Sequence, residues 1–515
     1  MQKRKEKHAS PHPLALRLED NLDSLRAAAT KRSDLVIRSF HVPGNRNQME
    51  CALVYIDGLV DLTSINESLL HPLMNVLSAH AGDSAGRFAA IQNCASAAGP
   101  AVIVEDMESL WQQIMQGDTV ILVNGYPQAV ASGTSGGERR SITEPTTQNV
   151  IRGPKEAFTE SLRTNTSLIS RRLKSPNLRI QNKVIGEQTQ TNVSVLYLEG
   201  IADESVVREI QERLDRIQTD GILEGGYIEE FIEDAALSPF PTIFNTERPD
   251  AATAGLLEGQ IAIVVDGSPF VLLAPVTFFT FFDSSEDYYQ RFYIASFLRL
   301  LRFGAFFVSL LLPSLYIAVT TYHPEMLPTT LLVSLVAQRE GVPLPGLIEA
   351  FLMEITFEVL REAGIRMPKA IGSAISIVGA LVLGQAAVAA GLISAAMVII
   401  VSFTAISNFV IPSPNLSVTV GLIRFALMLL AGTLGLYGVM VGLMLLCIHL
   451  ASLRSFGVPY LMPVAPLIWT NMKDVFIRFP LWSMRTRPDG IAGNNRLRQK
   501  KSLKPQPPRQ KPEKE

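Results

Sequence analysis

The sequence predicts an α/β N-terminal cytoplasmic region made of two similar subdomains, followed by an all-α multi-span membrane domain. Residues 370–453 carry one formally charged side chain, Arg424, although 18% of the whole chain is charged. A charge at the centre of a bilayer costs about 2.5–3.5 kcal/mol or more, so a long uncharged run is typical of membrane helices. Residues 1–290, in contrast, carry ordinary charge and contain one strand-and-glycine pattern twice.

The composition excludes several classes of protein. The chain has 515 residues and a net charge of −2, which leaves room for several domains and does not favour nucleic acid as a partner. The three cysteines are far apart and lack metal-ligand spacing: Cys51, Cys94 and Cys447. Residues 133–137 match G-x-S-x-G without the strand and helix that this motif needs, and there is no phosphate-binding loop. We therefore expect no enzyme, no metal and no cofactor.

Both ends of the chain are basic. Residues 1–30 lack the apolar run of a signal peptide, and residues 485–515 are rich in Lys, Arg and Pro. We expect both segments to be disordered tails. Basic flanks mark the cytoplasmic side of a membrane, so two cytoplasmic ends require an even number of spans.

The strand-and-glycine pattern is the evidence for two subdomains. ALVYIDGLVD at 52–61 is similar to SVLYLEGIAD at 194–203, and each has a downstream strand that also ends at a glycine. Gly58 precedes Gly125 by the same number of residues as Gly200 precedes Gly267. A signature repeated at one offset indicates two copies of one α/β unit.

The boundaries follow from this repeat. We expect a first α/β subdomain at 31–150, a linker helix at 151–175 and a second α/β subdomain at 176–290. The linker helix begins at Pro154 and contains several basic residues. It is either a solvated connector or a contact to another subunit or to phospholipid.

Residues 291–484 form the predicted membrane domain of about four spans, at 303–322, 370–390, 391–411 and 417–453. Two arginines precede the first span and fit the cytoplasmic side: Arg299 and Arg302. The last run is long for one span and short for two. An extra hairpin with a hinge at Gly435 is therefore the alternative.

The segment at 323–369 is expected to be re-entrant or amphipathic. Glu354, Glu358 and Glu362 recur every four residues, which places them along one face of a helix. They are either carboxylates at the membrane interface or a ring at the mouth of a cation pathway. Gln385, a polar residue in the uncharged block, joins them as a candidate for the ion pathway.

Small residues recur every four positions in the next segment: Gly372, Ser376, Ala380 and Gly384. Such a stripe lets helices approach closely, with or without a pore between them. Asn408 is a second polar residue in the uncharged block. Polar residues in such a block either hydrogen-bond a neighbouring helix, which is the commoner case, or line water.

Long motifs in both halves of the chain resemble one family, the A subunits of GerA-type spore germinant receptors. They are RGPKEAFTESLRTN (152–165), PSLYIAVTTYHPEMLPTTLL (313–332), REGVPLP (339–345), FEVLREAGIRMPKAIGSAISIVGALVLGQAAV (357–388) and NFVIPSPN (408–415). The resemblance runs from about residue 30 to residue 485. It implies a multi-pass protein of the inner membrane of the bacterial spore.

The same resemblance implies the partners and the activity. The A subunit is expected to work with a transporter-like B subunit, a lipoprotein C subunit and membrane lipid. It is expected to form a homo-oligomer, a pentamer in this family, that acts as a nutrient-gated cation channel and triggers germination. The alternatives are a membrane scaffold for the nutrient-binding partner and a secondary transporter, which would require inverted repeats around a midplane site.

Overall fold

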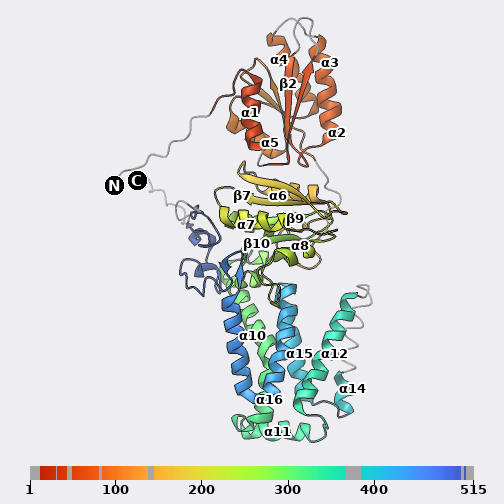
Figure 1. Ribbon diagram of the computed structural model, residues 1–515, viewed down its shortest axis with the longest axis vertical. Helices are drawn as coiled ribbons and strands as arrows, with labels where there is room; N and C mark the ends of the chain where they lie inside the picture. The colour runs from red at the N-terminus through yellow and green to blue at the C-terminus, as the bar shows by residue number, and fades with distance from the viewer. Residues whose placement is uncertain are drawn as a thin grey trace, which may run out of the picture.

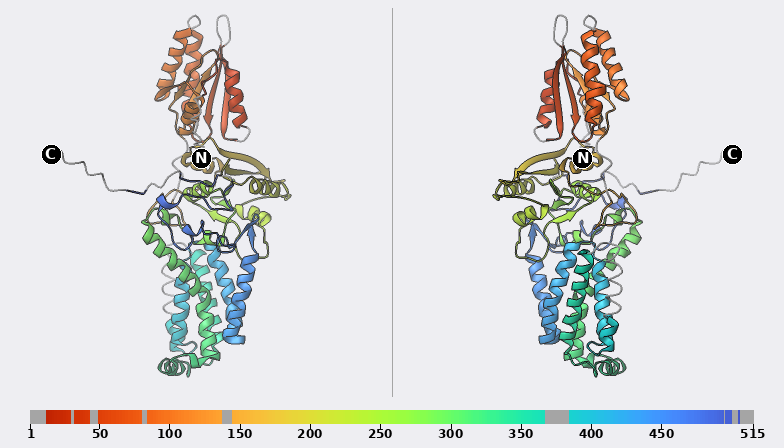
Figure 2. Two further views of the ribbon diagram at one scale, coloured as in Figure 1. Left: turned by 90° about the vertical axis from the view of Figure 1, so that its left-hand side faces the viewer. Right: turned by 90° about the vertical axis from the view of Figure 1, so that its right-hand side faces the viewer.

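The computed structural model describes residues 12–29, 32–42, 49–79, 84–136, 144–366, 384–493, 495–499 and 504–505. Three parts follow one another along the long axis: two α/β subdomains and a group of long helices (Figure 1). The side views show the same order, with most of the long helices roughly parallel to the long axis (Figure 2). The region before residue 290 is therefore α/β, as the sequence predicts.

The first subdomain is a five-stranded antiparallel sheet covered by helices on both faces. Its strand order is β1-β2-β4-β5-β3, with β1 at Leu35–Val42, β2 at Met49–Ile56, β3 at Ala101–Val104, β4 at Thr119–Val123 and β5 at Ala129–Ser132. The helices are α1 (Leu18–Ala29), α2 (Leu62–Ser64), the π-helix η1 (Ile65–Leu70), α3 (His71–Ala79), α4 (Ser84–Ala98) and α5 (Met107–Gln116). Alternate residues of β2 face opposite cores, because side chains alternate along a strand.

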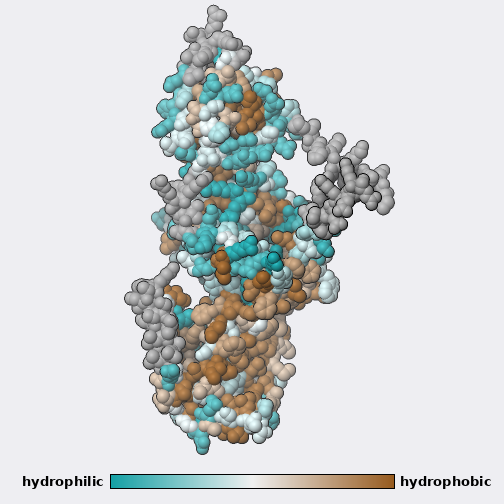
Figure 3. Space-filling model, turned by 180° about the vertical axis from the view of Figure 1, so that it is seen from behind, coloured by the Kyte–Doolittle hydropathy of each residue, from teal (hydrophilic) through white to brown (hydrophobic). Residues whose placement is uncertain are grey.

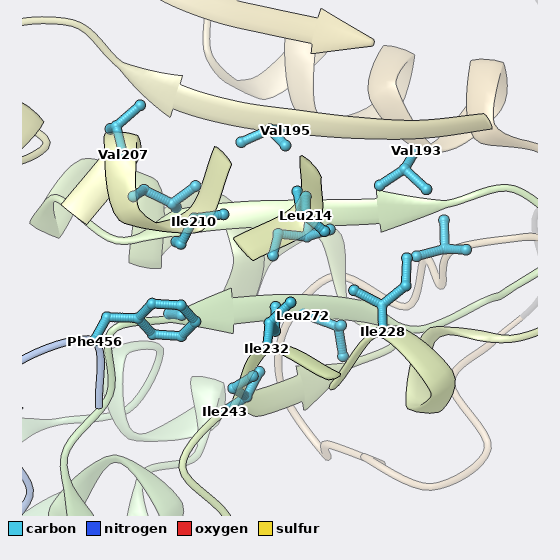
Figure 4. Close-up of a cluster of buried hydrophobic side chains, with 14 of the residues drawn as sticks. Val193, Val195, Val207, Ile210, Leu214, Ile228, Ile232, Ile243, Leu272 and Phe456 are labelled. Carbon is cyan, nitrogen blue, oxygen red and sulfur yellow. The ribbon is translucent and has the colours of Figure 1, made fainter. Parts of the chain in front are cut away.

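The second subdomain repeats this arrangement. Its strand order is β6-β7-β9-β10-β8, with β6 at Leu178–Ile185, β7 at Thr191–Leu198, β8 at Phe244–Thr246, β9 at Ile261–Val265 and β10 at Val271–Ala274. The helices are α6 (Leu162–Arg172), α7 (Glu204–Asp215), α8 (Gly225–Ile232) and α9 (Pro249–Glu258). Figure 4 shows one core of this sheet, where α7 and α8 meet the strands and Phe456 enters from the C-terminal part of the chain.

The four glycines of the sequence pattern lie at equivalent turns. Gly58 has φ +83° after β2, and Gly200 has φ +80° after β7. Gly125 and Gly267 have φ +89° and +84° after β4 and β9. Only glycine adopts such backbone angles without strain, so the two sheets share both their strand order and their turn chemistry.

Both predicted tails differ from the expectation. Residues 18–29 form α1, whose Leu18, Leu22 and Leu25 are buried in the first subdomain. Residues 485–493 and 495–499 lie against the second subdomain, where the Gly493 amide donates to the Ile201 carbonyl over 2.7 Å. A basic composition describes the average of a segment, whereas a few apolar residues within it are enough to fill a gap in a core.

The linker helix is shorter than expected and belongs to the second subdomain. It begins at Leu162, because Ser161 caps its N-terminus by accepting a hydrogen bond from the Thr164 amide. Leu168 and Ile169 are buried in one core of the second sheet. α6 is therefore a covering helix of that sheet.

The rest of the described chain is mostly helical. The helices are α10 (Phe292–Tyr322), α11 (Thr329–Arg339), α12 (Gly346–Arg366), α14 (Gly384–Ala389), α15 (Ala395–Phe409) and α16 (Pro414–Ser452). Short 3₁₀ turns lie at Phe278–Phe282, Ser285–Tyr288, Pro324–Met326, Met472–Asp474 and Leu481–Ser483, and a small two-stranded sheet pairs β11 (Arg454–Ser455) with β12 (Val458–Pro459). In the described part of the chain, α10 and α16 are long and apolar enough to cross a membrane, and α15 is a shorter apolar helix.

α16 is a helical hairpin rather than one straight helix. Gly435 interrupts it with φ +62° and ψ −143°. A straight helix would rise about 45 Å between Thr419 and His449. Instead Thr419 donates to the Pro239 carbonyl over 2.5 Å, and His449 lies 2.9 Å from the hydroxyl of Ser238. The first arm (residues 414–434) and the second arm (residues 436–452) therefore run in opposite directions, with the hinge at the glycine that the sequence suggested.

A Gly435→Ala variant tests the hairpin. The added Cβ would require a backbone conformation that side chains rarely adopt, and it would lie 2.9 Å from Cβ of Tyr322. We expect a loss of about 1–3 kcal/mol in stability, seen as a lower midpoint of thermal unfolding in detergent by tryptophan fluorescence. Gly304→Ala is the matched control, because this site in α10 is helical and has open space around it. Equal midpoints for the two variants would contradict the hinge.

Candidate functional site

The most unusual charge in the structure is Arg424, which is completely buried in the first arm of α16. Its Nη2 lies 2.8 Å from Oε2 of Glu354 and 3.5 Å from Oε1 of Glu358. Both carboxylates belong to α12, and Glu354 is itself 1% exposed. Burying a cation among apolar helices is costly unless a counter-charge accompanies it, and α12 supplies that charge.

Hydrogen bonds extend this ion pair to two further helices. Nη1 of Arg424 lies 3.3 Å from both the carbonyl and the hydroxyl of Ser309 on α10, to which it donates. The Ser309 hydroxyl donates in turn to Oδ1 of Asn408 on α15 over 3.2 Å. We call these residues the Arg424 network: Ser309, Glu354, Glu358, Asn408 and Arg424. It joins α10, α12, α15 and α16, and it confirms that Asn408 bonds a neighbouring helix.

Glu349 forms a second buried contact between α12 and α15. Its Oε1 accepts hydrogen bonds from the amide and the hydroxyl of Ser394, over 2.6 and 2.5 Å. Ser394 is also the N-terminal cap of α15, where it accepts from the Met397 amide. A carboxylate at this position is favoured, because the N-terminus of a helix carries partial positive charge. α12 is thus held at both its first turn and its middle.

The candidate ion-pathway residues do not meet at one place within a single chain. Glu354 and Glu358 join the Arg424 network, and Glu358 also pairs with Arg361 over 2.6 Å. Glu362 is exposed and pairs with Arg366 over 2.6 Å. Gln385 is exposed on α14. Along α12 the glutamates therefore become more exposed, from the buried carboxylate of Glu354 to the exposed carboxylate of Glu362.

Most of the small-residue stripe cannot be placed. Gly372, Ser376 and Ala380 lie outside the described residues. Gly384 is buried at the start of α14, where an added Cβ would contact Val398 at an ordinary 3.8 Å. Whether the stripe packs helices together stays a prediction.

The partner of Arg424 is the functional feature that sequence reasoning missed. The sequence singles out Arg424 as the one charge in its block but assigns it no carboxylate. The signal was available, because a lone cation in an apolar run requires a nearby anion, and the α12 glutamates precede it. What the sequence lacks is the direction in which each helix face points.

A second charged cluster lies where α10 meets the second subdomain. Arg299 is completely buried and lies 3.0 Å from Asp283, 2.9 Å from Asp474 and 3.4 Å from Asp287. Arg302 pairs with Asp287 over 2.6 Å. Burial raises the pKa of Asp283 and of Asp474, and the neighbouring Arg299 opposes that shift. The cluster ties the start of α10 to two segments that are far apart in sequence.

A cleft of about 600 Å³ lies between the two α/β subdomains. Its lining comes from the turn after β2 and from α6, including Asp61, Arg163 and Arg171. Arg163 pairs with Asp57 over 2.6 Å, and Arg171 donates to the Gly136 carbonyl over 3.1 Å. These basic residues of the predicted linker thus face the first subdomain of the same chain. Among the described residues, no group of three or more His, Cys, Asp or Glu side chains is placed to hold a metal ion.

A double-mutant cycle tests the buried ion pair. Arg424→Met leaves Glu354 buried without its counter-charge, and Glu354→Leu does the same to Arg424. We expect each single change to lower the free energy of unfolding by about 3–5 kcal/mol, and the double variant to lose less than the sum. Denaturant titration in detergent measures this.

Glu362→Gln is the control for this cycle. Its pair is exposed, so we expect a change of about 0–1 kcal/mol. Additive losses in the double variant would show that Arg424 and Glu354 are not energetically coupled.

Comparison with known proteins identifies the family. The family model described as Bacillus/Clostridium GerA spore germination protein matches residues 23–490. The chain is 45% identical over 493 residues to spore germination protein KA of Bacillus subtilis (strain 168), covering 95% of this chain and 89% of that protein. It is 43% identical over 483 residues to the uncharacterized membrane protein YfkQ of the same strain, covering 94% and 93%.

A solved structure is also similar. It is the N-terminal domain of the A subunit of the Bacillus megaterium spore germinant receptor GerK3, at 37% sequence identity, with a TM-score of 0.43 and coverage of 52% of this chain and 98% of that one. The family model spans nearly the whole chain, and the relatives match it through both the α/β and the helical parts. The chain therefore belongs to the GerA family of spore germination proteins.

Proposed function

We propose that this chain is the A subunit of a nutrient-sensing spore germinant receptor, and that several copies form a nutrient-gated cation channel in the inner membrane of the spore. The observation that carries the channel is the Arg424 network, a group of charges enclosed by apolar helices. Charges at membrane depth are costly, and where they persist they commonly mark ion or substrate pathways.

The membrane location is supported by the outer surface of the helical part. Figure 3 shows hydrophobic residues over most of this surface, below two largely hydrophilic subdomains. Exposed side chains there include Phe307, Leu422, Met440 and Leu445, each more than half exposed. Such a continuous apolar surface favours contact with lipid.

The hairpin sets the proposed topology. Both arms of α16 begin or end beside Ser238 and Pro239, and α10 starts at the same level through the Arg299 cluster. The two α/β subdomains then lie on one side of the membrane, which we take as the cytoplasmic side. The first arm (residues 414–434) and the shorter second arm (residues 436–452) both fall within the range of about 17–25 residues that can cross the hydrocarbon core.

α12 is the proposed lining of the ion pathway. In one chain Glu358 is partly exposed and Glu362 is exposed, so neighbouring copies would place rows of these carboxylates around an axis. Acidic rings concentrate cations and disfavour anions. Oε2 of Glu354 is taken up by the ion pair with Arg424, whereas its buried Oε1 has no hydrogen-bond partner among the described residues and is left to pair with water or an ion.

Gating would come from the partner subunits that the family resemblance implies, a transporter-like B subunit and a lipoprotein C subunit. A nutrient can shift a closed–open equilibrium only by its difference in affinity for the two states. The Arg424 network is a suitable part of such a switch, because α12 would have to exchange its contacts with α16 in order to move.

Ion flux tests the channel. We expect the three-subunit complex in liposomes to release potassium when a germination-triggering nutrient is added, and to release little without it. Flux that never depends on nutrient, or no flux at all, would favour the scaffold role instead.

The carboxylates of α12 are tested in the same liposomes. We expect Glu358→Gln and Glu362→Gln to weaken the preference for cations over anions, measured as the reversal potential in a salt gradient, because they remove negative charge from the pathway. Glu187→Gln, an exposed site in the second subdomain, is the control. Selectivity equal to that of the control would remove α12 from the pathway.

A further inference from the structure

The first three turns of α10 lie outside the part of the helix needed to cross a membrane. α10 has 31 residues, which gives a length of about 46 Å. The hydrocarbon core is about 30 Å thick, and the uncharged residues 303–322 are sufficient to span it. Given the membrane location proposed above, residues 292–302 lie in the headgroup region on the side of the α/β subdomains.

These turns carry their polar residues inward. Arg299 and Arg302 bind Asp287, and Ser296 donates to the Arg478 carbonyl over 3.1 Å. The outer face of the same turns is apolar: Phe297 is 65% exposed and Tyr293 is 52% exposed. A helix that faced water here would present the opposite pattern.

A second segment extends this outer face. Residues 475–479 lie alongside the start of α10. The Arg478 carbonyl accepts a hydrogen bond from Ser296, and the ring of Phe476 lies 5.0 Å from that of Phe303. Ile477 and Phe479, on either side of Arg478, are exposed. We call the combined surface the interfacial collar: Phe292, Tyr293, Phe297, Leu301, Ile477 and Phe479.

We propose that the interfacial collar lies in the headgroup region of the phospholipid bilayer. Residues 475–479, which come after the helical hairpin in the sequence, then contact the membrane together with the start of α10. Aromatic side chains are enriched at this depth, because an apolar ring with a polar edge suits the boundary between water and lipid. The collar is also continuous with Phe307 and Leu315, which are exposed farther along α10.

Charge at the rim of the collar favours lipid over a protein partner. Arg291 is exposed at the first turn of α10, and Lys473 precedes the second segment. Cationic side chains beside an apolar surface match the phosphates of lipid headgroups. The Arg299 cluster limits how deeply the collar can lie in the bilayer. Arg299 binds Asp283, Asp287 and Asp474 and cannot enter the hydrocarbon core without them.

Tryptophan quenching by brominated lipids tests the collar. The chain has three tryptophans, Trp111, Trp469 and Trp482. In a background with all three changed to Phe, the full-length protein carries a single probe as Phe297→Trp, Phe479→Trp or Phe307→Trp. In liposomes, we expect lipids brominated near the headgroup to quench the first two probes more strongly than lipids brominated near the chain end. The probe at 307 should show the opposite order.

Two controls separate the possible outcomes. A variant that retains only Trp111, in the first subdomain, should not be quenched by either lipid. If the probes at 297 and 479 behave like Trp111 while the probe at 307 is quenched, the collar is covered by protein or water and the inference is wrong. If the probe at 307 is also unquenched, the membrane location itself is wrong, which overturns the collar together with the proposed function.

Discussion

A guanidinium enclosed by apolar helices needs carboxylates beside it, and that requirement fixes the helical part of this protein. Arg424 carries the charge, and the middle of α12 supplies the compensation through Glu354 and Glu358. An unpaired buried charge would cost several kcal/mol, which is a large share of the stability of a typical domain. α12 therefore has one favourable rotation and one favourable height relative to the first arm of α16, and α10 and α15 join the same network through Ser309 and Asn408.

A second buried arginine also needs carboxylates beside it, where the helices meet the second α/β subdomain. Arg299 is enclosed by three aspartates from a turn before α10 and a turn after α16. These segments are brought together because α16 reverses at Gly435 and returns the chain to the level at which α10 starts. Arg424 and Arg299 thus each require a particular path of the chain, Arg424 within the helical part and Arg299 at its border.

At this border the helical part is attached to the second of the two α/β subdomains. Their shared strand order and their four equivalent glycine turns indicate one unit used twice. The second copy differs in being held by the end of the chain, through the Phe456 side chain in its core and the Gly493 amide on the Ile201 carbonyl. A movement of the second subdomain would therefore also move the part of the chain that follows α16. Through the Asp474–Arg299 pair it would reach the start of α10.

By itself the sequence determined what local chemistry can determine: an apolar C-terminal half and a repeated α/β unit with glycine at its turns. Absence of charge and positive-φ turns are properties of single positions, so they can be read without knowing the neighbours. Only the tertiary structure decided that Glu354 faces Arg424, because periodicity gives the face of a helix but not the helix opposite. It also decided that α16 is a hairpin, since Gly435 is compatible with a bend or a full reversal. It decided as well that residues 485–493 pack against the second subdomain, since buried side chains such as Ile491 outweigh a basic average composition.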